Sequence, residues 1–258
     1  MKEAFIIDGI RTPIGNFGGS LATTRTDDLA ALAIKGLMQR NSGVNWEEVE
    51  DLLLGCANQA GEDNRNVARM ALLLAGLPYS IGGETVNRLC SSGMAAAINA
   101  SRAIKLGDGD LYITGGVENM TRGPWVISKA SKPFGRDAQM FDTSFGWRFI
   151  NKKLHADFGT DGMGQTAENL VELYKISRED QDQFAYWSHM KATAAQKSGR
   201  LAKEIIPVEI PQRKAPSIVF DKDEFIKPNT TIEKLKQLRP AFKKEGGSVT
   251  AGNSSGLN

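Results

Sequence analysis

ETVNRLCSSGMAAA, residues 84–97, passes from a short strand pattern into an apolar helical run within a few positions. The extended residues 84–86 stop at Asn87, and Cys90 lies where the helical run begins. Free N–H groups at the start of a helix and the positive end of its dipole favour a thiolate there. The small residues 91–93 leave room for a substrate backbone. We therefore predict covalent catalysis through Cys90. The alternative is a cysteine that packs as a small hydrophobe.

Strand and helix patterns alternate over the first 120 residues. Short apolar runs typical of buried strands lie at residues 4–7, 52–54, 84–86 and 111–114. Helical spacing of apolar residues occurs at 30–38, 67–75 and 94–104. This alternation predicts an α/β layer with a mostly parallel sheet. The helix over 94–104 is apolar along nearly its whole length, so we expect a buried helix between layers that carries Cys90 inside the protein.

The pattern changes from about residue 119, where aromatic residues are scattered among Gly, Lys and Arg without a period. We interpret this part as a long excursion from the sheet, with helices over 165–174 and 177–198 and with Ser177 as an N-cap. The run 205–210 contains a proline and is at best an edge strand. The predicted organisation is thus an α/β core over 1–118, an inserted loop domain over 119–248 and a return to the core over 249–258.

Composition restricts the class of protein. The 258 residues are 41% hydrophobic with a formal net charge of +2, which does not suggest a nucleic-acid partner. No apolar run approaches the ~20 residues of a membrane span, and residue 1 leads directly into a strand pattern, so we expect neither membrane insertion nor secretion. Cys56 and Cys90 lack metal-ligand spacing and secretory context. We expect two reduced thiols in the cytoplasm, with no disulfide, no zinc site and Cys56 in the core.

Other mechanisms fit the chain less well. GTDGMG, residues 159–164, has the wrong glycine order for a dinucleotide loop and follows no strand, and no Gly-Lys-Ser/Thr phosphate loop occurs. A cysteine hydrolase needs a histidine base, but His155 and His189 lie in irregular or polar stretches and are expected at the surface. Glu118 follows a predicted strand. It either lies buried near Cys90 or, the reading we favour, ties the strand end to a loop.

Three separated motifs resemble thiolases in sequence, order and spacing: NRLCSSG at 87–93, GGVENM at 115–120 and TAGNSSGLN at 250–258. The similarity extends from residue 1 to residue 258. Within the family, residues 55–69 and 141–151 are most similar to 3-oxoadipyl-CoA thiolases. The resemblance implies a thiolase-like α/β fold, with acyl-CoA and coenzyme A as substrates and with no cofactor or metal.

The resemblance also implies roles for individual residues. Cys90 would attack the 3-keto carbon of a 3-oxoacyl-CoA, acetyl-CoA would leave, and coenzyme A would then take the shortened acyl group. The N–H of Cys90 would donate to the thioester oxygen. Lys227 stands where the family often has an arginine, and Gly162 where many thiolases have a histidine. The residues implied to bind coenzyme A are Leu154, Met163, Lys227, Lys234, Phe242, Ala251, Ser254 and Ser255.

Thiolases continue beyond the position of Asn258 into a second, similar half that supplies a histidine, an asparagine and a second cysteine. We therefore expect an N-terminal half that is inactive alone, because such catalytic groups act as a unit. The resemblance implies a homodimer or homotetramer for a complete fold. Two alternatives stay open. One is a biosynthetic acetoacetyl-CoA thiolase, and the other is a non-catalytic acyl-CoA binder that pairs with a separate C-terminal half.

Overall fold

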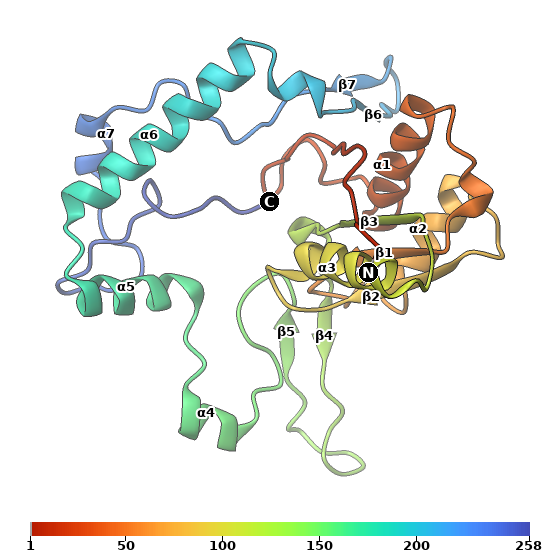
Figure 1. Ribbon diagram of the computed structural model, residues 1–258. Coiled ribbons are helices and arrows are strands. Elements are labelled where there is room, and N and C mark those ends of the chain that lie inside the picture. Colours follow the sequence, from red (N-terminus) through yellow and green to blue (C-terminus); the bar gives the residue numbers. More distant parts are fainter. Residues whose placement is uncertain (1) are drawn as a thin grey trace. The chain divides into compact units, whose positions relative to one another are not determined.

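The chain forms two compact units, seen in a computed structural model that describes residues 2–258 (Figure 1). The first unit comprises Met1–Pro124, Ala202–Lys222 and Asn258, and the second comprises Trp125–Leu201 and Asp223–Leu257. The expected core of residues 1–118 lies within the first unit. Residues 249–257 cluster with the second unit, and Asn258 with the first.

A three-stranded parallel sheet forms the centre of the first unit. Strand β1 (Asp51–Gly55) lies between β2 (Gly82–Val86) and β3 (Tyr112–Gly116), and all three run in the same direction. The predicted parallel α/β arrangement is thus confirmed. Because parallel strands end at one edge of a sheet, the segments that follow β1, β2 and β3 gather at the same carboxyl edge.

Helices cover the two faces of this sheet. Helices α1 (Thr26–Arg40) and α2 (Val67–Ala75) share one apolar cluster with Leu52 and Leu54, whereas Leu53 packs with α3 (Ser92–Leu106) in another. Successive side chains of a strand point to opposite faces, so the apolar run 52–54 serves both layers. This is why the strand appears as an unbroken apolar run in the sequence.

Local sequence signals set the ends of these helices. The Asn66 side-chain oxygen accepts the Arg69 N–H at 3.1 Å at the start of α2, as an N-cap does. At the other end of α2, Gly76 adopts the left-handed conformation with φ 89°. Gly107 ends α3 in the same way with φ 92°. Glycine adopts this conformation without a steric penalty.

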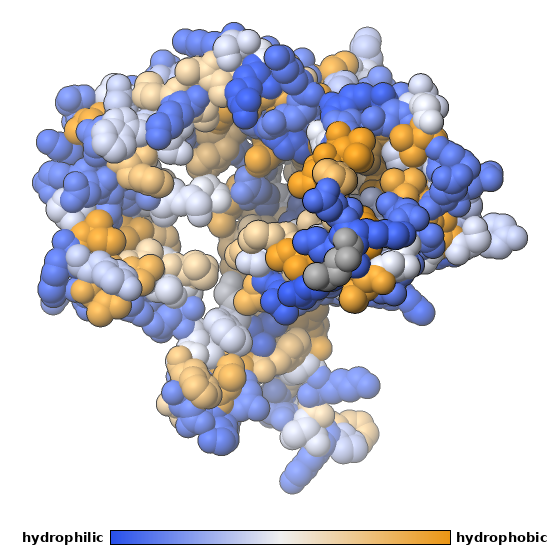
Figure 2. Space-filling view, in the orientation of Figure 1, coloured by the Kyte–Doolittle hydropathy of each residue, from blue (hydrophilic) through white to orange (hydrophobic). Residues whose placement is uncertain are grey.

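The outer face of α3 is open, and Cys90 is exposed. Met94 is 64% exposed and Ile98 43% exposed, and Figure 2 shows apolar side chains at the surface over this helix. The prediction of a helix buried between layers, with Cys90 inside the protein, is therefore wrong for this chain. Only the alanine face of α3, at Ala96 and Ala100, packs on the sheet.

Residues 4–7 do not form the strand that their apolar character predicts. Phe5, Ile6 and Ile7 are 70%, 93% and 79% exposed. In the described part of the chain, β3 pairs only with β1. An apolar groove of about 440 Å³, lined by α1, β3 and residues 8–16, lies along the other side of β3. Residues 4–7 pair with neither outer edge of the sheet and so form no ladder of hydrogen bonds. The apolar pattern alone does not produce a strand.

A small hairpin completes the first unit. Its strands β6 (Val208–Ile210) and β7 (Ile218–Phe220) pair antiparallel. Strand β6 begins only after Pro207, which agrees with the edge strand predicted for 205–210. Val208 and Ile210 pack with Leu21 and Leu29. Short 3₁₀ turns lie at Trp46–Glu48, Met120–Arg122 and Leu201–Lys203.

The second unit contains a hairpin and four helices. Strands β4 (Trp125–Ile127) and β5 (Met140–Asp142) pair antiparallel. The helices are α4 (Lys152–Phe158), α5 (Met163–Tyr174), α6 (Arg178–Lys197) and α7 (Ile232–Lys236). The hydroxyl of Ser177 accepts the Asp180 N–H at 3.0 Å, which confirms the predicted cap of α6. Among the described residues, no helix is both long and apolar enough to cross a bilayer.

Candidate functional site

Cys90 lies in a tight turn between β2 and α3, at the carboxyl edge of the sheet. Leu89, directly before it, has a positive φ of 52°, which is unusual for a residue with a branched side chain. The buried Ser92 holds this turn closed. Its hydroxyl accepts the Arg88 N–H at 2.9 Å and donates to the Leu89 carbonyl at 2.5 Å. The turn brings Cys90 to the start of α3, as predicted.

Glycines allow α3 to begin directly on the sheet. A Cβ atom on Gly55 would overlap the backbone of Ser92 and Gly93. A Cβ on Gly116 would lie 3.0 Å from the Gly55 carbonyl oxygen, and one on Gly93 3.4 Å from the Gly115 oxygen. The glycines of the two motifs therefore meet at one crossing, where the absence of side chains lets backbone approach backbone.

The thiol and the main chain of Cys90 are both accessible for chemistry. The side chain is exposed, and within the part of the chain that the structure describes the Cys90 N–H donates no hydrogen bond. The neighbouring Ser91 N–H instead donates to the Arg88 carbonyl at 3.1 Å. A thiolate at this position can attack an acyl carbon, and the free N–H can donate to the oxygen that becomes negative.

Asn87 connects this turn to the loop that follows β1. Its side-chain nitrogen donates to the Ala57 carbonyl at 3.1 Å, and its side-chain oxygen accepts the Leu89 N–H at 3.0 Å. Asn87 was not predicted as a functional residue from the sequence. The available signal was an asparagine directly after a strand, a position from which its side chain often accepts a main-chain N–H two residues on.

Glu118 ties the end of β3 to the same loop. One carboxyl oxygen accepts the Ala57 N–H at 2.9 Å and the other accepts the Asn58 N–H at 3.1 Å. The favoured reading of Glu118 as a strand-to-loop tie is thus confirmed. Although the residue as a whole is exposed, desolvation around the carboxyl raises the pKa of Glu118, and the two N–H groups oppose this effect.

Cys56 has no access to a substrate. It is 1% exposed, which confirms its place in the core, and its sulfur lies 3.5 Å from Asp63 Oδ2. Burial, with the nearby Glu118 and Asp63 carboxylates, raises the pKa of Cys56 to about 12. The ligand-type atoms of Cys56, Asp63 and Glu118 lie within 4.8 Å of one another. Because Asp63 accepts the Gln59 and Gly61 N–H groups, its carboxylate, like that of Glu118, holds the loop.

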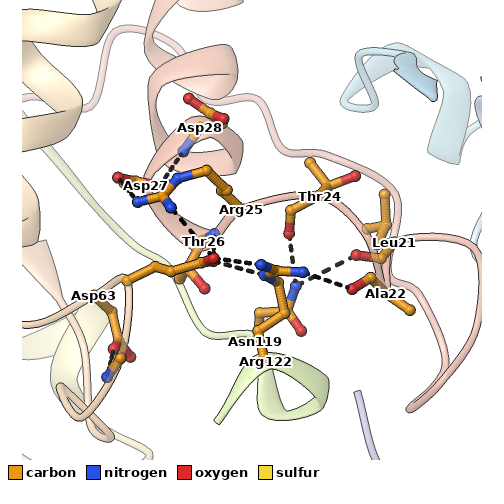
Figure 3. Close-up of polar contacts among 12 residues, drawn as sticks. Leu21, Ala22, Thr24, Arg25, Thr26, Asp27, Asp28, Asp63, Asn119 and Arg122 are labelled. Carbon is orange, nitrogen blue, oxygen red and sulfur yellow. Dashed lines mark hydrogen bonds and ion pairs between the residues drawn. The ribbon is translucent and has the colours of Figure 1, made fainter. Parts of the chain in front are cut away.

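The rest of the GGVENM segment fixes a third loop. Figure 3 shows Asn119 and Arg122 directed at the main chain of residues 21–24. The Asn119 amide donates to the Thr24 carbonyl at 3.3 Å, and the Arg122 guanidinium donates to the Ala22 carbonyl at 3.1 Å. Arg122 also pairs with Glu62, with Nε at 2.6 Å from Oε2, and this lowers the pKa of Glu62. Sequence reasoning missed this network because its members are far apart in the chain.

The residues implied to bind coenzyme A all lie in the second unit. Leu154 is exposed on α4, and Met163 is exposed at the first position of α5. Phe242 lies against the start of α5, where a Cβ on Gly164 would overlap its ring. The structure thus brings Phe242 and the first turn of α5 together.

Two lysines of the predicted set are exposed. The Lys227 ammonium lies 4.9 Å from the centroid of the Phe225 ring, a cation–π distance. Lys234, in α7, donates to the Asn229 carbonyl at 2.9 Å. Ala251, Ser254 and Ser255 lie in and after a turn around the buried Thr250, whose carbonyl accepts the Ser254 hydroxyl at 2.8 Å.

The two histidines also lie in the second unit. His155 is exposed as predicted, with Nδ1 at 2.7 Å from the Thr160 hydroxyl. His189 is partly buried, contrary to the surface position expected for it, because its ring stacks on Phe225 with centroids 6.2 Å apart. Burial and the Lys227 charge lower the pKa of His189.

Comparisons with known proteins agree with the three motifs. Residues 4–258 match the family model described as "Thiolase, N-terminal domain". The chain is 56% identical to the 3-oxoadipyl-CoA/3-oxo-5,6-dehydrosuberyl-CoA thiolase of Escherichia coli K12 and 55% identical to a beta-ketoadipyl-CoA thiolase of Acinetobacter baylyi. Each alignment covers 100% of this chain and 64% of the relative.

A solved structure gives the same result for the fold. The crystal structure of the Bacillus anthracis acetyl-CoA acetyltransferase superposes with a TM-score of 0.87 at 39% identity, over 99% of this chain and 63% of that one. The thiolase-like fold predicted from the sequence is therefore confirmed, and the chain spans 64% of the length of the curated relatives named above. The chain belongs to the thiolase family and corresponds to its N-terminal part.

Proposed function

We propose that this chain carries the nucleophile of a thiolase that cleaves 3-oxoadipyl-CoA with coenzyme A. The observation that supports it most is the position of Cys90: an exposed thiol with a free N–H in the turn that starts α3. The relatives named for 3-oxoadipyl-CoA or beta-ketoadipyl-CoA are 53–56% identical, against 39% for the structure named as an acetyl-CoA acetyltransferase. This difference favours the dicarboxylic substrate over acetoacetyl-CoA.

The proposed reaction forms and breaks one bond at each step. The Cys90 thiolate attacks the 3-keto carbon, and the bond between carbons 2 and 3 breaks. Carbon 2 leaves as the enolate of acetyl-CoA and takes up a proton. Cys90 then holds a succinyl thioester, which the thiolate of coenzyme A removes as succinyl-CoA. The Cys90 N–H donates to the oxygen of the succinyl thioester.

The proposed coenzyme A site is in the second unit. Leu154, Met163 and Phe242 would contact the apolar part of the substrate. The ammonium groups of Lys227 and Lys234 would face the phosphates of coenzyme A. Ala251, Ser254 and Ser255 would lie beside the arm of coenzyme A that ends in the thioester. Coenzyme A serves as a substrate in this proposal, and no metal or other cofactor takes part.

We further propose that the 258 residues acylate Cys90 only slowly and do not turn over, because the missing acid–base group acts in the step in which carbon 2 leaves. A thiolase needs a second acid–base group for the carbon of acetyl-CoA, and Cys56 cannot provide it, because its thiol is buried and has a pKa of about 12. Removing one member of such a set costs several powers of ten in rate. A separate chain that carries the remaining thiolase residues would restore turnover, and a homodimer or homotetramer is the assembly we propose for the complete fold.

The test is intact-mass analysis of the chain after incubation with 3-oxoadipyl-CoA or acetoacetyl-CoA, with Cys90→Ala as control. The proposal predicts a succinyl adduct that forms faster than the acetyl adduct and is absent in the control. Faster acetylation would favour the acetoacetyl-CoA alternative. With free coenzyme A added, steady release of acetyl-CoA beyond one equivalent would contradict the absence of turnover.

A further inference from the structure

The turn before Cys90 has a conformation that its own sequence does not favour. Leu89 carries a Cβ and a branched side chain, yet its φ of 52° lies in the left-handed region. Residues in such conformations persist only where surrounding contacts over-determine them. Identifying the contacts on Leu89 therefore identifies what fixes the main chain at Cys90.

Two side chains hold Leu89 from opposite sides. Asn87 Oδ1 accepts the Leu89 N–H at 3.0 Å, and the Ser92 hydroxyl donates to the Leu89 carbonyl at 2.5 Å. Ser92 is buried in the first turn of α3 and is fixed by the helix itself. Asn87 is exposed and lies outside any helix or strand, so it needs an anchor of its own.

That anchor is the loop after β1. The Asn87 amide donates to the Ala57 carbonyl at 3.1 Å, and the N–H groups of Ala57 and Asn58 each donate to one oxygen of Glu118. Glu118 in turn follows β3 closely. A continuous set of hydrogen bonds thus runs from the end of β3, through the loop after β1, to the residue before Cys90.

We propose that Asn87 is a positioning residue for Cys90, anchored by the loop that Glu118 holds, and that it aims the free Cys90 N–H at the acyl oxygen. This inference rests on the proposed role of Cys90 as acyl acceptor. Asn87 acts through Leu89: without its side-chain oxygen, the Leu89 N–H loses its partner, and among the described residues only the bonds from Ser92 to the Leu89 carbonyl still oppose relaxation of the left-handed φ. The thiol stays present, but the Cys90 N–H, whose direction depends on that φ, is held less firmly.

Two reagents separate these effects on the same thiol. In acylation by p-nitrophenyl acetate, the thiolate attacks the carbonyl carbon, the oxygen becomes negative, and p-nitrophenolate leaves. In alkylation by iodoacetamide, the sulfur–carbon bond forms as iodide leaves, and no oxyanion develops. Both reactions need the thiolate and neither needs coenzyme A. The ratio of the acylation rate to the alkylation rate at one pH therefore measures how well the Cys90 N–H stabilises the oxyanion. It does not depend on thiol ionisation or on coenzyme A binding.

The experiment measures both rates at Cys90 for the 258-residue chain and for Asn87→Ala, Glu118→Gln and Asn45→Ala. Asn45 is a matched control: its side chain accepts the Glu47 N–H at the start of a 3₁₀ turn, and it is exposed in the same unit. Cys56 reports folding, because a thiol that is 1% exposed stays unmodified while the unit is folded.

We expect the acylation-to-alkylation ratio to fall about tenfold in Asn87→Ala. This is less than the ~100-fold loss for a donor in a dry site, because water reaches Cys90. Glu118→Gln keeps one of two acceptor oxygens and should lower the ratio by less, and Asn45→Ala should leave it unchanged. An unchanged ratio in Asn87→Ala, or an equal fall in both rates, overturns the proposal. If Asn87→Ala labels at Cys56, the Glu118→Gln ratio decides instead.

A failure of the proposed thiolase function would give a different experimental result from a failure of the role proposed for Asn87. The absence of any adduct from 3-oxoadipyl-CoA would contradict the thiolase role of Cys90, but it would leave the ratio of the two small-reagent rates as a valid test of Asn87.

Discussion

Gly55, the last residue of β1, lies so close to Gly93 in the first turn of α3 that a Cβ atom on Gly55 would overlap the Gly93 nitrogen. The contact fixes the distance of the start of α3 from the sheet, and Cys90 lies two residues before that start. A change at this crossing should therefore affect both the stability of the first unit and the chemistry of the thiol.

Gly55→Ala should lower the free energy of unfolding by about 3 kcal/mol, because the obstructing atoms are backbone and cannot move as a side chain would. The same variant should move the turn and change the rate at which iodoacetamide alkylates Cys90. Urea denaturation and intact-mass kinetics measure the two effects. Gly43→Ala is the control, since a Cβ there meets nothing within 4 Å. Equal stability of the two variants would show that the crossing is looser than described.

Cys56 should make stability depend on pH in the alkaline range. Its pKa is raised from 9.0 to about 12 in the folded protein, so above pH 9 the unfolded chain loses this proton while the folded chain keeps it. The stabilisation is complete below pH 9 and is lost as the pH rises towards 12. Between pH 9 and 10.5 the wild type should lose about 1–2 kcal/mol more than Cys56→Ala. Parallel pH profiles for the two proteins would contradict this.

The Glu62–Arg122 pair should stabilise the loop at residues 21–24. Arg122→Ala leaves the largely buried Glu62 carboxylate without its main partner and frees the Ala22 carbonyl, so we expect a loss of about 3 kcal/mol at pH 7. Because the pKa of Glu62 is lowered in the folded protein, its contribution is present at neutral pH and is lost as the pH falls through and below the ordinary value of 4.5. Thermal or urea denaturation of the two proteins at both pH values measures this.

Two outcomes decide that prediction. The stability gap between wild type and Arg122→Ala should narrow in acid, whereas an exposed arginine of the same unit, changed in Arg102→Ala, should cost little at any pH. A gap that stays constant down to pH 3 would mean that Arg122 acts through packing rather than through the ion pair.

Gly164 offers a test of the proposed coenzyme A site. A Cβ there would overlap the Phe242 ring, whereas a Cβ on the neighbouring Gly162 meets nothing within 4 Å. If Phe242 contacts coenzyme A, Gly164→Ala should weaken binding about tenfold, a loss of ~1.4 kcal/mol, by displacing the ring. Gly162→Ala should leave the affinity within a factor of two to three. Isothermal titration with coenzyme A measures both. Equal affinities would remove Phe242 from the site.

The sequence predicted the parts of the fold that depend on local pattern. The helices at α2 and α6 and the strands at β1 and β2 were placed to within a few residues, because apolar spacing and caps such as Ser177 act locally. Residues 4–7 show the limit of this reasoning. An apolar pattern becomes a strand only when the segment pairs with another strand, and these residues leave the outer edge of β3 unpaired. The pattern carries no information about which segments pair.

The candidate site likewise combines a residue that local sequence pattern predicted with contacts that it did not predict. Cys90 was identified because strand end, small residues and helix start are adjacent in sequence, and the motifs made the family recognisable. The ties from Asn87 to Ala57 and from Arg122 to Glu62 join segments that are distant in the chain. No periodic pattern in the sequence predicts contacts between residues so far apart. The exposure of Cys90 was mispredicted for a related reason. An apolar helix indicates that its faces pack against other residues, but it does not indicate which residues those are.

The central claim is that Cys90 accepts the acyl group, and peptide mapping tests it most directly. After incubation with 3-oxoadipyl-CoA and cleavage with trypsin, the peptide of residues 89–102 should carry a succinyl group, and the peptide that contains Cys56 should carry none. The Cys90→Ala chain should remain unmodified. If instead the wild-type chain forms no succinyl adduct on residues 89–102, while iodoacetamide still alkylates Cys90, the thiol is reactive but is not the acyl acceptor of this chain, and the account is contradicted.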